Sequence, residues 1–250
     1  MPNAVYLSPH LDDAVFSCGG LIARQVEQDQ SVTVLTIFAG DPPAGPYTDY
    51  AEELHERWGL ADAPVEGRRR EDLEACRTLG AAAMHLAVPE AIYRQATSGR
   101  PLYASEQAIF DQIQPADLTL VEQLAEAIDE VSPAGSQLYA PIGIGGHVDH
   151  LLVRKAAGQL ARPVWYYHDF PYAAGTMELP NELGVPEGVG SVMPVDETEL
   201  EQWAQAIWAY RSQRSTFWDD LRQLRHELGL YLDDHKGLPI FAPTAGRRAR

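Results

Sequence analysis

The first forty residues alternate a buried strand, an amphipathic helix and a second buried strand. Residues 4–7 and 31–38 are apolar runs of strand length, and the second run (SVTVLTIF) is rich in β-branched residues. Between them, residues 14–28 carry apolar side chains at near-helical spacing. This order within about 35 residues is the βαβ unit of a parallel sheet. The chain is therefore restricted to folds in which helices cover a parallel sheet.

The rest of the chain continues this alternation, with long interruptions. Charge and apolar patterns predict helices at 50–59, 67–80, 118–131, 149–161 and 196–227, and strands at 81–88, 137–141 and 163–168. Residues 89–117 and 169–195 show no clear periodicity, and loops of that length are usually functional lids or insertions. We expect one doubly wound α/β domain over residues 1–250, with helices on both faces of a mostly parallel sheet and a disordered basic end (GRRAR).

Charge and cysteine usage limit the partners. A formal net charge of −17 argues against nucleic acid and against an anionic membrane surface, whereas a neutral or cationic small molecule stays compatible. Cys18 and Cys76 make no disulfide framework. No signal peptide precedes the first strand, and no apolar run is long enough to span a membrane. We expect a cytoplasmic protein with a small-molecule substrate and no membrane partner; a homo-oligomer stays open.

The segment SPHLDDAVFSCGG (8–20) follows the first strand directly. His10, Asp12 and Asp13 therefore come at the carboxyl end of a parallel strand, where open α/β sheets bind ligands. An imidazole and a carboxylate three residues apart can share one cation such as Zn²⁺, and the second acid stays free to accept a proton. The alternative is that both acids only cap the following helix.

The segment GIGGHVDH (143–150) follows the predicted strand 137–141 and begins a helix, so it lies at the same edge of the sheet. His147, Asp149 and His150 form an H-x-D-H pattern, in which the acid can orient a metal-binding histidine. A helix-capping aspartate between two surface histidines is the alternative. Because both clusters follow predicted strands, we expect one shared metal site.

These two segments resemble the signature motifs of the PIG-L, or LmbE-like, deacetylases. Three further segments are similar to that family: RRREDLEACRTLGA (68–81), VWYYHDFPYA (164–173) and AYRSQ (209–213). The resemblance implies a Rossmann-like fold and a zinc-dependent enzyme that removes the acetyl group from an N-acetylglucosamine-type amino sugar or glycoside. The segments 41–66, 89–117 and 174–195 match nothing in the family that we can place, and such loops would set the substrate.

The resemblance also implies residue roles. His10, Asp13 and His150 would bind the metal, Asp12 would be the general base, and a protonated His147 would stabilise the oxyanion. Asp149 would orient a histidine. Three protein ligands leave an open position for water, as a catalytic zinc requires. The same nitrogen and oxygen donors accept Fe²⁺.

Two residues are candidate substrate contacts. Arg68 matches the family's helix arginine, and its alternative role is an ion pair with Glu71. Asp169 is the candidate in the aromatic segment 164–173, whose other members are expected mainly in the core.

Other functions remain to be weighed. A metal-dependent amidase acting on a non-sugar or thiol-conjugate amide is the closest alternative. Two-metal phosphoesterases need more carboxylate ligands than these motifs contain. A nucleotide-binding protein is disfavoured because neither a G-x-G-x-x-G nor a Walker loop follows the first strand.

Overall fold

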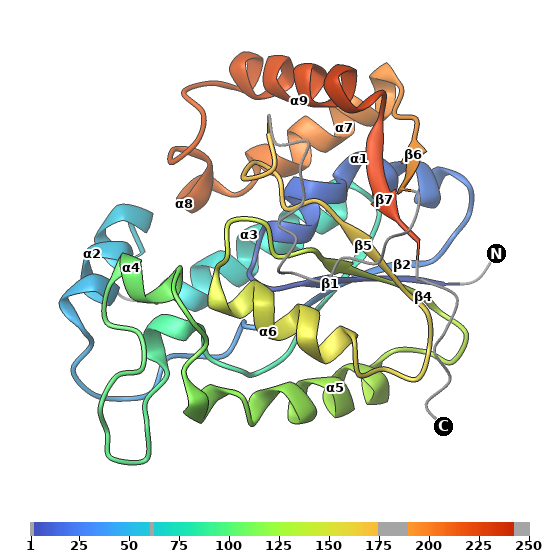
Figure 1. The fold of residues 1–250 in the computed structure, drawn as a ribbon. Coiled ribbons are helices and arrows are strands. Elements are labelled where there is room, and N and C mark those ends of the chain that lie inside the picture. Colours follow the sequence, from blue (N-terminus) through green and yellow to red (C-terminus); the bar gives the residue numbers. More distant parts are fainter. Residues whose placement is uncertain (1–2, 61–62, 175–189, 243–250) are drawn as a thin grey trace.

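The computed structural model describes residues 3–60, 63–174 and 190–242. Its centre is a sheet with the strand order β3-β2-β1-β4-β5-β7-β6 (Figure 1). The first five strands in that order are parallel, and β7 and β6 add an antiparallel edge. The strands are β1 (Ala4–Ser8), β2 (Val32–Thr36), β3 (Ala82–His85), β4 (Gln137–Pro141), β5 (Val164–Tyr167), β6 (Gly190–Met193) and β7 (Leu238–Phe241). The predicted doubly wound, mostly parallel fold is confirmed.

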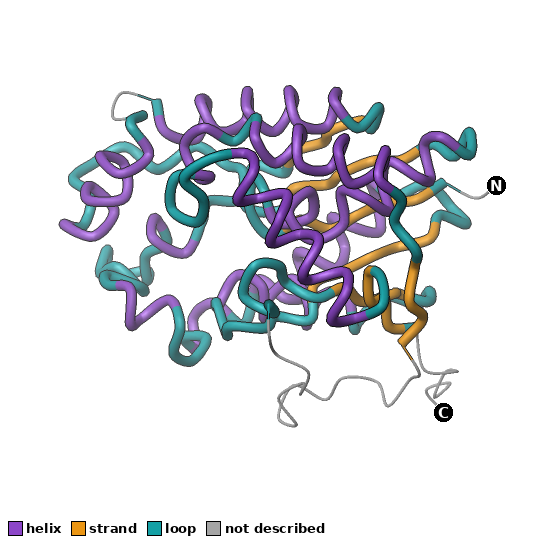
Figure 2. The backbone as a smooth tube through the Cα atoms, turned by 90° about the horizontal axis from the view of Figure 1, so that it is seen from above, coloured by secondary structure: helices purple, strands orange, loops and turns teal. Residues whose placement is uncertain are grey.

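Helices pack on both faces of this sheet, as Figures 1 and 2 show. The longer helices are α1 (Asp13–Glu27), α2 (Asp49–Trp58), α3 (Pro64–Thr78), α5 (Leu120–Val131), α6 (Val148–Ala157), α7 (Glu197–Trp208) and α9 (Leu221–His235). Short turns of helix are η1 (Ala91–Tyr93), α4 (Glu106–Ile109), η2 (Pro115–Asp117) and α8 (Arg211–Arg214). The layers follow from the side-chain alternation of β1: Ala4 and Tyr6 pack with α1, α3, α7 and α9, whereas Val5 and Leu7 pack with α5 and α6.

The sequence patterns did not predict the antiparallel edge of the sheet, formed by β7 and β6. β6 falls in a stretch assigned to a loop, and β7 has four residues with a proline at its second position, which removes a ladder donor and hides the strand pattern. The predicted helical stretch 196–227 divides into α7, α8 and the start of α9, and the segment 89–117 contains η1, α4 and η2. The predicted disorder of the last residues and most of the predicted loop 174–195 lie outside the described residues.

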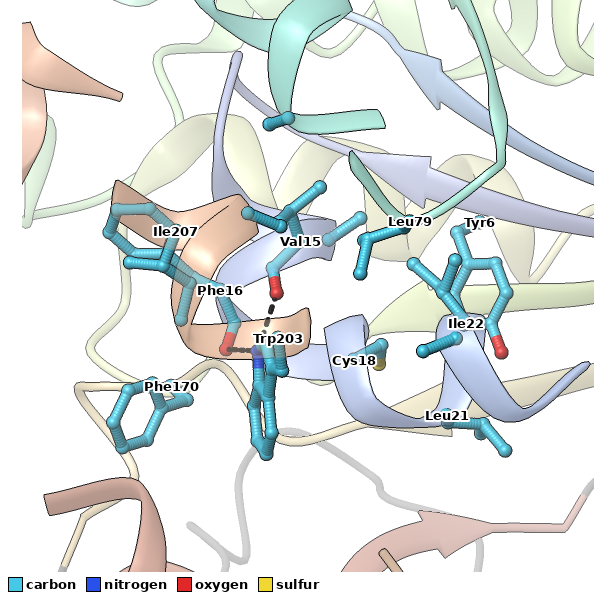
Figure 3. Packing of buried hydrophobic residues seen from close by; sticks show 14 of the residues in the cluster. Tyr6, Val15, Phe16, Cys18, Leu21, Ile22, Leu79, Phe170, Trp203 and Ile207 are labelled. Atoms are coloured by element: carbon cyan, nitrogen blue, oxygen red, sulfur yellow. Dashed lines mark hydrogen bonds between the residues drawn. The ribbon is translucent and has the colours of Figure 1, made fainter. Parts of the chain in front are cut away.

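α1 and α7 pack closely against each other. Trp203 donates its indole N–H to the carbonyl oxygens of Val15 and Phe16, at 2.8 and 3.2 Å (Figure 3). Gly19 lets the two helices approach, because a Cβ added there would lie 2.2 Å from the Trp203 ring. This contact fixes α1, whose N-terminal end carries Asp12 and Asp13.

The two cysteines are free and buried, as expected. A cytoplasmic location stays a prediction. Among the described residues, none of the helices is both long and apolar enough to cross a membrane.

Candidate active site

Both histidine–aspartate segments lie at the carboxyl edge of the sheet. β1 and β4 are parallel neighbours, with Tyr6 opposite Tyr139, so the turns that follow them meet at the same edge. The strand order reverses between these two strands, and ligands bind at such switch points in open α/β sheets. α2 and α4 lie beyond this edge, on the left of Figure 1.

Three predicted ligands converge there. Asp13 Oδ2 lies 3.2 Å from His10 Nδ1 and 3.2 Å from His150 Nε2. The ring centres of His10 and His150 are 5.3 Å apart. The exposed fractions of the three side chains are 13% or less, so little solvent competes for their donor atoms. The structure therefore brings together the residues that the sequence assigned to the metal.

The outer ring nitrogens of both histidines bond to carboxylates. His10 Nε2 donates to Asp149 Oδ2 at 2.9 Å, and His150 Nδ1 donates to Asp169 Oδ1 at 2.7 Å. A metal-binding histidine typically has such a carboxylate partner, which fixes its tautomer and its ring orientation. The nitrogens left over, Nδ1 of His10 and Nε2 of His150, are the two that face Asp13.

The electrostatics of this cluster favour a cation. Burial lowers the pKa of His150, but Asp13 and then Asp169 outweigh it and raise the pKa to about 10. The same balance raises the pKa of His10, through Asp13 and Asp149. Asp13 shows the counterpart, because His150 and His10 hold its pKa below its usual range despite burial. Two imidazole nitrogens and one carboxylate in a negative surrounding are a donor set that fits Zn²⁺.

Asp12 lies beside this set and binds none of its members. It occupies the N-cap position of α1, but its side chain accepts no capping bond, and the Ser8 hydroxyl accepts the Ala14 N–H instead. Within the described part of the chain its carboxylate accepts no hydrogen bond, and it lines the cavity. Burial, and then the charge of Asp13, raise the pKa of Asp12 to about 7. The capping role weighed from the sequence is not the role of this carboxylate.

His147 is the third histidine of the cluster. Its Nδ1 accepts the Asp149 N–H at 3.2 Å and caps α6, so its hydrogen is on Nε2. Burial, and then the neighbouring His10, hold the pKa of His147 well below its usual value. A neutral ring that donates through Nε2 thus replaces the protonated His147 expected from the sequence. Donor nitrogens of His10, His147 and His150 lie within 4.8 Å of one another, which makes these three a second candidate ligand set.

A cavity of about 330 Å³ opens over the cluster. Its lining combines the acids and histidines with aromatic side chains from α2 and from the segments around residues 110, 172 and 217. Arg68 lines it and is 3% exposed. The guanidinium donates to Glu90 at 2.5 Å and lies 4.4 Å from the Trp58 ring centre. The alternative prediction, an ion pair of Arg68 with Glu71, is wrong. Arg68 pairs with Glu90, and Glu71 accepts the N–H and the hydroxyl of Ser212.

Asp169 does not lie where a substrate contact, its predicted role, would have to lie. It is 2% exposed and does not line the cavity. Oδ1 accepts from His150, and Oδ2 accepts the N–H groups of Gly143 and Ile144 at 2.7 and 2.9 Å. Its position is that of a group that orients His150. Tyr172, three residues later, does line the cavity and is 44% exposed.

Sequence reasoning missed two buried charges near the site, Glu90 and Arg94. Both come from the segment 89–117, where no motif marks them. Only their burial, at 6% and 7% exposure, and their ion pairs with Arg68 and Asp149 reveal them.

The chain is similar to several known deacetylases. Two 2′-N-acetylparomamine deacetylases are similar to the chain: that of Niallia circulans is 32% identical over 67% of the chain, and that of Streptomyces fradiae is 33% identical over 84%. The matched parts make up 66% and 73% of those proteins, so the chain spans between two thirds and three quarters of their length. The crystal structure of a zinc-inhibited form of the teicoplanin deacetylase Orf2 superimposes with a TM-score of 0.77 and 29% identity, covering 98% of this chain and all of that one.

The family described as PIG-L, GlcNAc-PI de-N-acetylase, matches residues 5–161. That range contains both histidine–aspartate segments and β1 to β4, which hold them at one edge of the sheet. The chain belongs to the PIG-L family.

Proposed function

We propose that this protein is a metal-dependent N-deacetylase that hydrolyses the acetamido group of an N-acetylglucosamine-type residue in a small glycoside. One observation carries the proposal: two histidines and Asp13 converge at the cavity, and a second carboxylate, Asp12, lies unbonded beside them. The paromamine and teicoplanin relatives, which are named for deacetylation, support the same reaction.

The metal that we propose is Zn²⁺, held by His10, Asp13 and His150. When bound, it would supply Lewis acidity that polarises the acetyl carbonyl and makes water more acidic. The donor set also accepts Fe²⁺. Zinc appears as an inhibitor in the Orf2 structure, so metal content and activity have to be measured at several zinc concentrations.

The chain's own residues would handle the protons and the charge. Asp12 would take a proton from the attacking water at a carboxylate oxygen and return it to the leaving amine, which leaves poorly unless protonated. His147 would donate its Nε2–H to the carbonyl oxygen as negative charge develops there, an interaction worth about 3–4 kcal/mol. Asp149 and Asp169 would keep the rings of His10 and His150 in place through the bonds described above.

The cavity would position the sugar. Arg68 presents a guanidinium that is held by Glu90 and stacked on Trp58, which suits contacts with hydroxyl groups. The exposed aromatic rings of Phe110 and Tyr172 line the same cavity and offer flat faces for the sugar or its aglycone.

The test measures bound metal and acetate release from N-acetylglucosamine glycosides for the wild type and Asp12→Asn. The variant should keep its metal and lose about 10²–10⁴-fold in kcat, because only the proton acceptor has changed. Asp233→Asn, an exposed aspartate on α9, is the matched control and should be as active as the wild type. Full activity in Asp12→Asn, or release of phosphate rather than acetate from candidate substrates, would contradict the proposal.

A further inference from the structure

Arg94 is a buried arginine that bridges two buried carboxylates. Its Nη2 lies 2.7 Å from Asp149 Oδ1 and 2.8 Å from Asp117 Oδ2, and its Nε donates to Asp117 at 2.9 Å. Nη1 donates to the Pro89 carbonyl at 3.1 Å, and the guanidinium lies 4.9 Å from the Phe38 ring centre. Contacts on so many sides hold the planar guanidinium in one position.

Asp149 connects this arginine to His10. It is fully buried, and its Oδ2 accepts from His10 Nε2 at 2.9 Å and from the Ala91 N–H at 3.0 Å. Burial alone raises a carboxyl pKa, but Arg94 and then the His10 bond outweigh it and hold the pKa of Asp149 below its usual value. The contact with Asp149 Oδ2 holds Nε2 on one side of the His10 ring, so Nδ1 faces Asp13 at 3.2 Å.

We propose that Arg94 is a positioning residue of the metal site, which fixes Asp149 and, through it, the tautomer and ring orientation of His10. This inference rests on the proposed function, because it takes His10 as a metal ligand. Arg94 itself touches neither His10 nor the cavity. Two groups connect it to His10: Asp149, which makes a polar contact with each, and Phe38, whose ring centre lies 4.9 Å from the guanidinium and 6.3 Å from the His10 ring centre. The polar route through Asp149 is the one that we propose.

The second histidine is held in another way. Asp169, the partner of His150, accepts two backbone N–H groups, those of Gly143 and Ile144, on its other carboxylate oxygen. Loss of Arg94 should therefore disturb the His10 side of the site and leave the His150 side intact. The contrast also gives a role to part of the segment 89–117, which contributes Ala91, Arg94 and Asp117 to the support of His10.

The experiment measures zinc affinity by titrating the metal-free protein against a chromophoric chelator, for the wild type, Arg94→Met and Arg94→Lys. Arg94→Met should bind zinc about 10–100-fold more weakly, the usual effect of losing an outer partner of a ligand. The zinc affinity of Arg94→Lys should lie between those of the wild type and Arg94→Met. A single ammonium group cannot contact both carboxylates as the planar guanidinium does. Circular dichroism of the metal-free variants checks that each is folded.

A double-mutant cycle with Asp149→Asn separates positioning from general stabilisation. If Arg94 acts through Asp149, then Arg94→Met should weaken zinc binding no further in an Asp149→Asn background. Equal losses in both backgrounds would mean that Arg94 acts independently of Asp149, and would overturn the inference.

Arg24→Met is the matched control. Arg24 donates two hydrogen bonds to Glu199, of 2.6 and 2.8 Å, so it is also an arginine bound to a carboxylate. It does not line the cavity. This variant should lose stability and keep its zinc affinity.

The outcomes separate this inference from the proposed function. Unchanged zinc affinity in a folded Arg94→Met overturns the inference alone, and if that variant does not fold, Arg94→Lys decides by the same criterion. A wild-type protein that binds no zinc removes the proposed zinc site, and the inference with it.

Discussion

Buried imidazoles in this protein differ in charge because their neighbours differ. His150 faces two carboxylates, which raise its pKa to about 10 against the effect of burial. His168 is 5% exposed, and neither of its ring nitrogens has a hydrogen-bond partner among the described residues. Burial, and then His235, lower the pKa of His168 to about 4. The surroundings of His150 thus favour a positive charge on its ring, whereas the surroundings of His168 favour a neutral ring.

His168 gives a pH-dependent stability. The unfolded chain protonates this side chain near pH 6.5, but the folded protein does so only near pH 4, so stability falls as the pH falls through that window. His168→Phe keeps the ring that stacks on Phe241 and removes the titration. Between pH 7 and pH 4.5 the variant should lose about 2 kcal/mol less than the wild type.

Urea unfolding at the two pH values measures this difference. His226→Gln, on the exposed face of α9, is the control and should follow the wild type. Parallel loss of stability in His168→Phe and the wild type would show that His168 is not the group responsible.

Among the elements, α1 illustrates how packing can reverse a local preference. Gly19 and Gly20 stand in the middle of this helix, where alanine would be intrinsically better. The structure explains Gly19, because Trp203 of α7 occupies the space of its missing Cβ and is held there by two hydrogen bonds. Asp12 occupies the N-cap position of α1 and Asp13 begins the helix, so the same contact helps to position the candidate site.

We predict that Gly19→Ala destabilises the protein by about 2 kcal/mol, as overpacking of a close helix contact does. Gly229→Ala in α9 is the matched control. A Cβ there meets nothing within 4 Å, so the substitution should stabilise by about 0.5–1 kcal/mol. Thermal or denaturant unfolding measures both, and a Gly19→Ala protein as stable as the wild type would contradict the packing shown in Figure 3.

At the scale of the whole molecule, the proposed metal site joins segments far apart in the chain. His10 and Asp13 follow β1, His150 lies in the first turn of α6, and Asp169 follows β5. A cation that binds only when these segments are assembled stabilises the folded state. Metal binding should therefore be visible in the unfolding temperature, independently of any substrate.

We predict that removing the metal with a chelator lowers the Tm by roughly 5–10 °C relative to protein in zinc at about 100 times its Kd. His150→Ala should abolish this difference, and His147→Ala should keep it. Differential scanning calorimetry with and without zinc is the measurement. Loss of the shift in both variants would favour the ligand set His10, His147 and His150. A shift kept in His150→Ala would contradict the proposed ligand set.

The sequence was most informative where chemistry and local order coincide. The βαβ pattern at 4–38 and the strand before GIGGHVDH were enough to bring both histidine–aspartate segments to one edge of the sheet, because parallel strands share their carboxyl ends. It was least informative where a residue acts through a long-range contact. Arg94, Glu90 and strand β7 each depend on partners that no local pattern reveals.

The amino-acid order alone determined the parallel α/β fold and the meeting of the two histidine–aspartate segments at one edge of the sheet, since both follow from strand periodicity and from short motifs next to strand ends. The choice of His10, Asp13 and His150 among those residues came from the family resemblance. Only the tertiary structure decided which carboxylate holds which ring, that Asp12 is left unbonded, and that Asp169 lies behind His150 instead of in the cavity. The physical reason is that hydrogen bonds and burial depend on atoms brought together from separate segments, 139 residues apart for His10 and Asp149 and 19 apart for His150 and Asp169. A side chain's type limits what it can do, but its neighbours in space decide whether it is charged and which way it faces.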